Sequence, residues 1–126
     1  MLCFSDYNLL RQSVAEDILP AAHAADLGVL NGWSIMRGWL TRVPAENFIP
    51  RGNWGEDQKR AEAMRLWCAE RSIETLELTL QFCLREDRIH GNPIRSLNIE
   101  QLEWNVRAAM AAVADATIAE FTAADL

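Results

Sequence analysis

The sequence has few residues of the kinds that define disulfide-rich or metal-binding proteins. Its three cysteines, Cys3, Cys68 and Cys83, lie far apart and form no Cys-x-x-Cys motif. Its two histidines, His23 and His90, belong to no spaced Cys/His pattern of the kind that binds zinc. We therefore expect three reduced thiols, as in a cytosolic protein, and no metal site.

Basic charge and long apolar runs are also scarce. Twelve Lys and Arg residues stand against 18 Asp and Glu residues, which gives a net charge of −6. An excess of negative charge argues against a nucleic-acid groove or an anionic membrane surface as the main partner. No apolar run approaches the roughly 18 residues of a bilayer span, and Asp6 ends the first apolar run before a signal peptide develops. We expect a cytoplasmic protein that binds neither nucleic acid nor membrane.

Apolar residues, in contrast, are abundant and make up 50% of the 126 positions. That fraction is enough for a packed core in one domain over residues 1–126. Three short apolar runs, residues 1–5, 28–31 and 88–91, are typical of buried strands. They alternate with helical patterns, which predicts an α/β fold with parallel strands joined by right-handed crossovers. Three such strands are few, because both edges of their sheet would be unpaired.

Helix signals lie between and after these runs. A capping-box sequence begins at Ser13, and the helix predicted after it has Pro20 in its first turn. Residues 32–56 are irregular and hold three of the five tryptophans. A loop of this length is either a functional element, such as a lid, or an ordered surface loop held by its own aromatic side chains.

The second half of the sequence predicts further helices. Two are expected over residues 57–70 and 73–84, the second with Ser72 as its N-cap. Asn98 is the N-cap predicted for a last main helix, whose apolar stripe runs to Val113 and is followed by a short tail.

Ligands of parallel α/β folds bind beyond the carboxyl ends of the strands. The corresponding segments here are residues 5–10, 32–38 and 91–98. The third is chemically the most specific, because Arg95 can fork onto phosphate oxygens and Ser96 can donate its hydroxyl just ahead of a helix N-terminus. The alternative is an ordinary capped loop with a solvated arginine.

Three stretches together resemble the aldo-keto reductase family in order and spacing. Residues 5–41 contain Tyr-Asn-Leu-Leu, a Leu-Pro-containing helix, Gly-Val-Leu and Arg-Gly. Residues 69–84 resemble the family's penultimate helix, and residues 98–110 resemble its C-terminal cofactor signature. The sugar-dehydrogenase branch is the most similar. A whole (β/α)8 TIM barrel needs about 250 residues, so the resemblance implies a partial barrel, its last three parallel strands with their helices, and makes residues 1–126 the C-terminal half-barrel.

The resemblance also implies a function. The intact enzyme would be an NAD(P)-dependent oxidoreductase that transfers a hydride between nicotinamide and an aldose or another carbonyl substrate, with NADP, or NAD, as cofactor. The family's catalytic Asp, Tyr, Lys and His lie in earlier strands, so no catalytic residue is expected here, and Tyr7 is predicted to be structural. Whether the chain alone is an enzyme stays open. The partner would be the missing N-terminal half, or alternatively a second copy of a non-catalytic half-barrel that acts as a homodimer or interaction module.

Four cofactor contacts are implied near the last helix. Arg95 and Ser96 fall at positions that contact phosphate in the family, and Gln101 falls beside the 2′-phosphate of NADP. Asn105 matches the Asn that meets the adenine. Trp104 departs from the family pattern, because a Glu at this position commonly pairs with the adenine amino group. Arg95 favours NADP over NAD.

The resemblance implies four further cofactor contacts, Trp33, Ser34, Ile35 and Arg37, in a segment whose register is open. In one register, Trp33, Ser34 and Ile35 fall on the family's Ser-Pro-Leu. In the other, shifted by one residue, Trp33 is the aromatic that stacks against nicotinamide and Ser34 is the Ser. Phe4 stands where many members have a Gln that holds the carboxamide.

Overall fold

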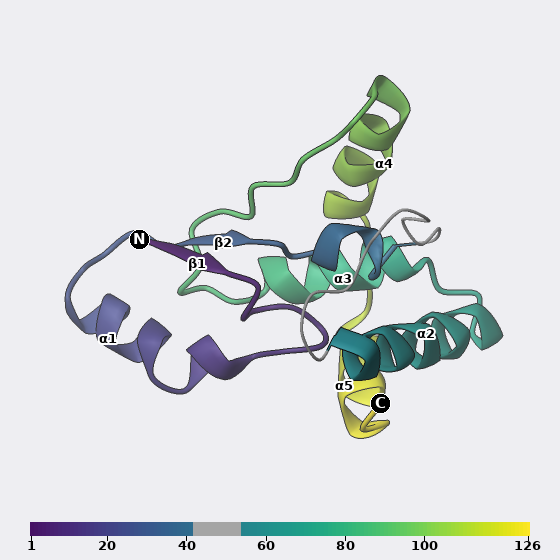
Figure 1. Cartoon of the computed structure of the whole chain (residues 1–126), viewed down its shortest axis with the longest axis horizontal. Helices are drawn as coiled ribbons and strands as arrows, with labels where there is room; N and C mark the ends of the chain where they lie inside the picture. The colour runs from purple at the N-terminus through teal and green to yellow at the C-terminus, as the bar shows by residue number, and fades with distance from the viewer. Residues whose placement is uncertain (42–53) are drawn as a thin grey trace.

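The computed structural model describes residues 1–41 and 54–126, except for the side chains of Arg37 and Trp54. Residues 42–53, about half of the predicted irregular loop, therefore lie outside the described residues. Figure 1 shows the two strands side by side, with α3 to their right and α4 projecting from the rest of the ribbon. No helix in the described part of the chain is long and apolar enough to cross a membrane.

Two parallel strands form the centre of the N-terminal part. β1 (Leu2–Phe4) pairs with β2 (Leu30–Gly32), which confirms both predicted strands to within two residues. The crossover between them carries a 3-10 turn, η1 (Ser13–Ala15), and a short helix, α1 (Ile18–Ala24). Pro20 lies in the first turn of α1, as predicted, where its missing N–H has no helical acceptor to lose.

The third predicted strand is reduced to one parallel bridge. Gly91 pairs with Leu30 on the side of β2 away from β1. His90 N donates to Val29 O and Asn31 N donates to Gly91 O, each at 2.8 Å. The parallel direction of this third segment is as predicted. The predicted length is wrong, because Pro93 follows closely and cannot donate a hydrogen bond to a ladder.

α2 (Trp54–Glu70) and α3 (Thr75–Leu84) follow as predicted, with one error at their junction. Ser72 is not the N-cap of α3. It has a left-handed φ of 56°, and Ile73 N donates to Cys68 O at 2.9 Å, so this turn terminates α2 in the manner of a Schellman motif. Glu74 holds the N-cap position of α3 without a side-chain hydrogen bond.

α4 (Ile99–Ala109) begins at the predicted cap, since Asn98 accepts a hydrogen bond from Gln101 N. The predicted continuation to Val113 is wrong, because the helix ends at Met110. The predicted tail forms a further helix, α5 (Asp115–Ala123). Tertiary contact explains α5, because the ring of Phe121 packs edge-on against Trp67 at 5.2 Å between centroids.

Two buried clusters hold these elements together. One lies between the strands, α1 and the end of α3, and includes Cys3, Leu19, Val29 and Cys83. The other lies between α2, α3 and α5 around Met64, Trp67, Leu78 and Phe121. The three cysteines are buried and free. η2 (Met36–Gly38) carries the chain from β2 to the second cluster, where Met36, Trp39 and Leu40 are buried.

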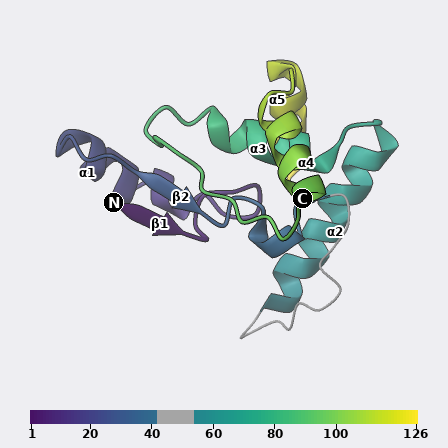
Figure 2. The ribbon, with the colours of Figure 1, turned by 90° about the horizontal axis from the view of Figure 1, so that it is seen from above.

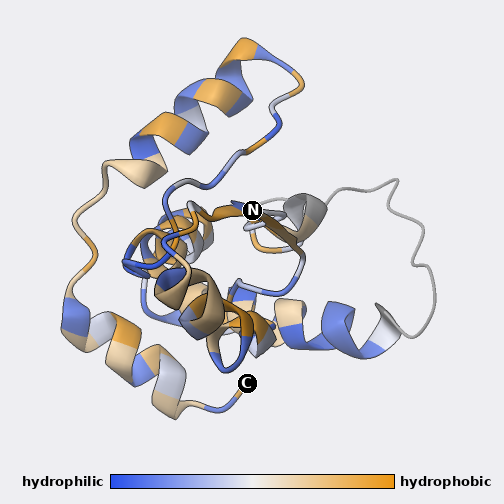
Figure 3. Cartoon of the chain, turned by 90° about the vertical axis from the view of Figure 1, so that its left-hand side faces the viewer, coloured by the Kyte–Doolittle hydropathy of each residue, from blue (hydrophilic) through white to orange (hydrophobic). Residues whose placement is uncertain are grey.

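Two apolar faces remain exposed. Successive residues of a strand point to opposite faces of its sheet, and Leu2, Phe4 and Leu30 lie on the face that no described helix covers. α4 carries the second face, an apolar stripe at helical spacing that consists of Ile99, Leu102, Val106 and Met110. Figure 2 shows the strands and α4 from above, and Figure 3 shows orange segments alternating with blue ones along α4.

Replacing the α4 cap should destabilise the protein measurably. Asn98→Ala removes the side-chain acceptor for Gln101 N, so we expect the free energy of unfolding to fall by about 1 kcal/mol in urea denaturation. Ser72→Ala is the matched control, because Ser72 contributes its backbone and not its side chain to the end of α2, and it should change that free energy by less than about 0.5 kcal/mol. Equal losses for the two variants would contradict this assignment of the caps.

Candidate functional site

The carboxyl ends of the strands bring three loops to one edge of the sheet. The loops follow β1 at Ser5, β2 at Trp33 and the bridge residue Gly91 at Asn92. Ser5 N donates to Gly32 O at 3.0 Å, which keeps the first two loops together as the strands end. This edge is where parallel α/β folds bind ligands.

An aromatic pair occupies the ends of β1 and β2. The rings of Phe4 and Trp33 lie 4.6 Å apart between centroids at an interplanar angle of 48°, and Phe4 is 52% exposed. Trp33 is half-buried and has a left-handed φ of 68°. Gly32 makes room for the pair, because a Cβ there would lie 2.9 Å from Cδ2 of Phe4. The pair therefore presents a partly exposed aromatic surface at the ligand-binding edge.

The other residues predicted in this segment are less accessible. Ser34 is buried, and its hydroxyl donates to Asn92 Oδ1 at 3.0 Å, so it is engaged within the protein. Ile35 is half-buried and packs with Ile94 against α3 and α4. The backbone of Arg37 lies in η2, and its side chain lies outside the described residues.

The second predicted group surrounds the N-terminus of α4. Asn105 Nδ2 donates to Ser96 Oγ at 3.0 Å, and Gln101 Oε1 accepts from Leu97 N at 2.8 Å. These bonds hold the loop before α4 against its first turns. Arg95 is exposed, and no carboxylate in residues 1–41 and 54–126 forms an ion pair with it. The structure thus brings Ser96, Gln101 and Asn105 together beside an exposed guanidinium.

Two asparagines that sequence analysis missed connect the strand-end loops. Asn31 is fully buried in β2, and its Nδ2 donates to Tyr7 O and to Asn92 Oδ1, each at 2.8 Å. Nδ2 also lies 3.3 Å from Ser34 Oγ. The available signal was the asparagine itself, a polar residue in the otherwise apolar run Gly-Val-Leu-Asn.

Tyr7, predicted to be structural, is packed within the protein. Its ring stacks on Phe82 at 5.5 Å between centroids, and its hydroxyl donates to Glu86 Oε2 at 3.5 Å. Burial and the neighbouring Glu86 carboxylate raise the pKa of Tyr7 to about 12. Arg88 donates to both oxygens of Glu86, at 2.6 and 2.7 Å, and these bonds lower the pKa of Glu86. Tyr7 is therefore held as a neutral phenol near neutral pH, with its hydroxyl engaged by Glu86 within the protein.

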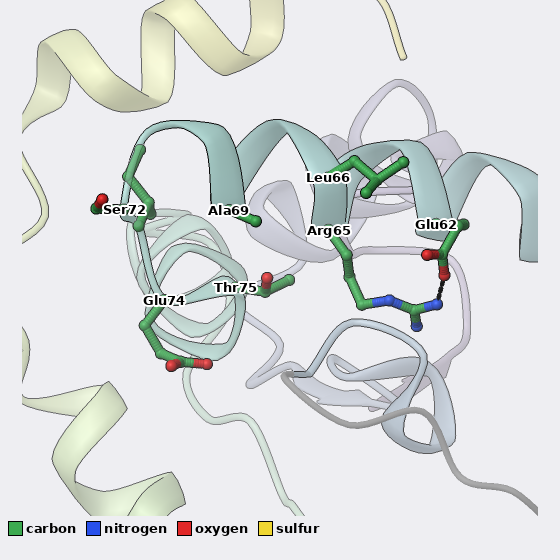
Figure 4. Close-up of a pocket in the computed structure, with 8 residues that line it drawn as sticks. Glu62, Arg65, Leu66, Ala69, Ser72, Glu74 and Thr75 are labelled. Atoms are coloured by element: carbon green, nitrogen blue, oxygen red, sulfur yellow. Dashed lines mark ion pairs between the residues drawn. The ribbon is translucent and has the colours of Figure 1, made fainter.

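A groove of about 580 Å³ lies elsewhere, between α2 and the start of α3. Figure 4 shows Arg65 and Glu62 joined by an ion pair along α2, with Glu74 and Thr75 across from them. Arg65 also donates to Trp39 O at 3.0 Å. None of the residues predicted to bind cofactor lines this groove, and its cation is already paired. The strand-end loops and the start of α4 remain the candidate site.

The sequence model of the aldo/keto reductase family matches residues 5–125. The chain belongs to the aldo/keto reductase family. This confirms the predicted resemblance. A search of curated proteins gives no significant match to the sequence.

Two solved structures of an aldo/keto reductase share the fold. Both are of aldo-keto reductase AKR11C1 from Bacillus halodurans. The holo form is 22% identical with a TM-score of 0.71, and the match covers 96% of this chain and 41% of the reductase chain. The apo form is 21% identical with a TM-score of 0.73, and the match covers 97% of this chain and 42% of the reductase chain. The chain therefore has the α/β fold of part of a reductase and spans about two fifths of these relatives.

The Glu86–Arg88 pair makes stability depend on pH. Because Arg88 lowers the pKa of folded Glu86, the ionised carboxylate stabilises the fold above the unfolded pKa of about 4.3, and this is lost as pH falls through the folded pKa. We expect Glu86→Gln to lose less free energy of unfolding than wild type between about pH 5 and pH 3 in urea denaturation. Glu103→Gln, an exposed control, should behave like wild type. An equally steep loss in Glu86→Gln would contradict the pairing.

Proposed function

We propose that this chain is the cofactor-binding part of an NAD(P)-dependent oxidoreductase. The intact enzyme would transfer a hydride between nicotinamide and an aldose or another carbonyl substrate, with the hydride supplied by the cofactor. Family membership supports the reaction class. The observation that carries the proposal is a partly exposed aromatic pair at the strand ends, accompanied by an exposed arginine ahead of the preorganised start of α4.

The aromatic pair fits the nicotinamide end of the cofactor. Trp33 is half-exposed at the ligand-binding edge, and Phe4 supports its ring. This supports the register in which Trp33 is the stacking aromatic, because the other register gives its ring no role. Ser34 then acts through its bond to Asn92 by holding the loop in place, and Ile35 packs beneath it.

The start of α4 fits a phosphate. The N-terminus of a helix carries unpaired N–H groups and a partial positive charge, which favour an anion. Arg95 adds a fork of N–H donors suited to phosphate oxygens, while Gln101 and Asn105 hold the preceding loop. We assign the 2′-phosphate of NADP to Arg95 and Ser96, which makes NADP the preferred cofactor over NAD.

We further propose that residues 1–126 form the last three strands, with their helices, of a (β/α)8 barrel. The uncovered sheet face of Leu2, Phe4 and Leu30 supports this, because a barrel would cover it with other strands. The residues that protonate the carbonyl substrate in this family belong to preceding strands. We therefore propose that these residues bind the cofactor but do not catalyse the reaction by themselves. Their partner would be the N-terminal half-barrel, and the protein would act in the cytoplasm.

Removing the Arg95 guanidinium should weaken the binding of NADPH more than the binding of NADH. NADH lacks the 2′-phosphate, so we expect Arg95→Ala to raise the dissociation constant of NADPH about tenfold and that of NADH by less than about threefold. Energy transfer from tryptophan to bound dinucleotide measures both constants. Arg107→Ala removes an exposed arginine at the other end of α4 and serves as the control. No binding of either dinucleotide to wild type, or equal weakening of both, would contradict the proposal.

The alternative is a non-catalytic half-barrel that self-associates, and the apolar stripe of α4 is the observation that favours it. An exposed stripe of this kind is typical of an interface. Under this alternative, light scattering gives a dimer for wild type and a monomer for Leu102→Glu, with Glu103→Lys as a control of similar position off the stripe. A monomeric wild type would remove the alternative.

A further inference from the structure

The cofactor site proposed above is built from loops that follow three different strands, and one side chain touches all three. We propose that Asn31 is a positioning residue that holds these loops in a single arrangement; this inference rests on the proposed function. Asn31 touches no cofactor itself, because its side chain is fully buried. It acts through Trp33, Ser34 and the loop that leads to Arg95.

The geometry of the Asn31 amide supports this role. Asn31 lies on β2, opposite Cys3 of β1, and its backbone N–H donates to Gly91 O. Its side-chain Nδ2 donates to Tyr7 O after β1 and to Asn92 Oδ1 after the bridge residue, each at 2.8 Å. Asn92 Oδ1 in turn accepts from Ser34 Oγ, 3.0 Å away in the loop after β2. A single amide group thus joins the start of every strand-end loop.

The burial of this amide argues that the three contacts matter. A residue between two paired neighbours in a small α/β sheet is normally apolar. Here the Nδ2 group of Asn31 donates to its acceptors, whereas Asn31 Oδ1 has no hydrogen-bond partner among the described residues. A buried unpaired acceptor is destabilising. The arrangement therefore trades local stability for a connection between the loops.

Two other fully buried polar side chains, those of Asn8 and Thr79, do not join one strand-end loop to another. Asn8 is as fully buried, but its side chain bonds only to Ser5, Leu10 and Arg11 within its own loop. Thr79 is also fully buried and donates to Thr75 O and Leu40 O, away from the strand ends. Thr79→Val therefore removes buried hydrogen bonds of similar number without disconnecting the loops, and it is the matched control.

Hydrogen exchange of the ligand-free protein tests the connection itself. Asn31→Ala should speed amide exchange about tenfold in the loops at residues 5–8, 33–36 and 91–96 together, relative to the change in global stability. Asn92→Ala keeps the contact with Tyr7 O, so it should loosen only the second and third loops. Thr79→Val should speed exchange in α3 and leave all three loops at the global rate. The inference is overturned if Asn31→Ala and Thr79→Val give the same pattern.

NADPH affinity tests the consequence for the site. All variants are compared under conditions in which they are folded. Asn31→Ala should then weaken the affinity for NADPH about tenfold, and Thr79→Val should leave this affinity unchanged. If wild type binds no NADPH, the proposed function fails, while the exchange experiment still decides whether Asn31 joins the loops. If wild type binds and Asn31→Ala binds equally well, the positioning role is wrong and the proposed function stands.

Discussion

The parallel pairing of β2 with its neighbours on both sides is the constraint on which the rest of the structure depends. Leu30 N donates to Met1 O on one side, and Asn31 N donates to Gly91 O on the other. Because these strands run in the same direction, their carboxyl ends meet at one edge, and the loops that follow them must lie side by side. Without this pairing, Phe4, Trp33 and Asn92 would have no reason to approach one another.

Local signals in the sequence predicted the elements whose cause is local. Asn98 with Gln101, Pro20 in the first turn of α1 and the two apolar strand runs each act through their own neighbours. Predictions failed at one local turn and at one place where a tertiary contact decides the outcome. Ser72 has a good capping side chain but serves as the left-handed residue that ends α2, and α5 forms because Phe121 finds Trp67.

The candidate site was predictable only through the family resemblance and only in part. No spacing rule brings Trp33 to Phe4, because their approach depends on strand register and on the absence of a Cβ at Gly32. Asn31 and Asn92 were missed for the same reason, since 61 residues separate them in sequence. The predicted polar residues near α4 are bound mainly to the protein itself, so in the proposed function they preorganise the site and the exposed Arg95 meets the anion.

In the proposed function, binding is separate from chemistry: the described residues hold the two ends of a dinucleotide, while the reacting groups belong to preceding strands of the intact enzyme. An NMR titration of the chain with NADPH tests this most directly. We expect shifts for the Trp33 indole, the amides of Asn92 and Ser96 and the Asn105 side chain, with residues of the α2–α3 groove unmoved. Shifts confined to Arg65, Ser72 and Thr75, or no shifts at millimolar NADPH, would contradict it.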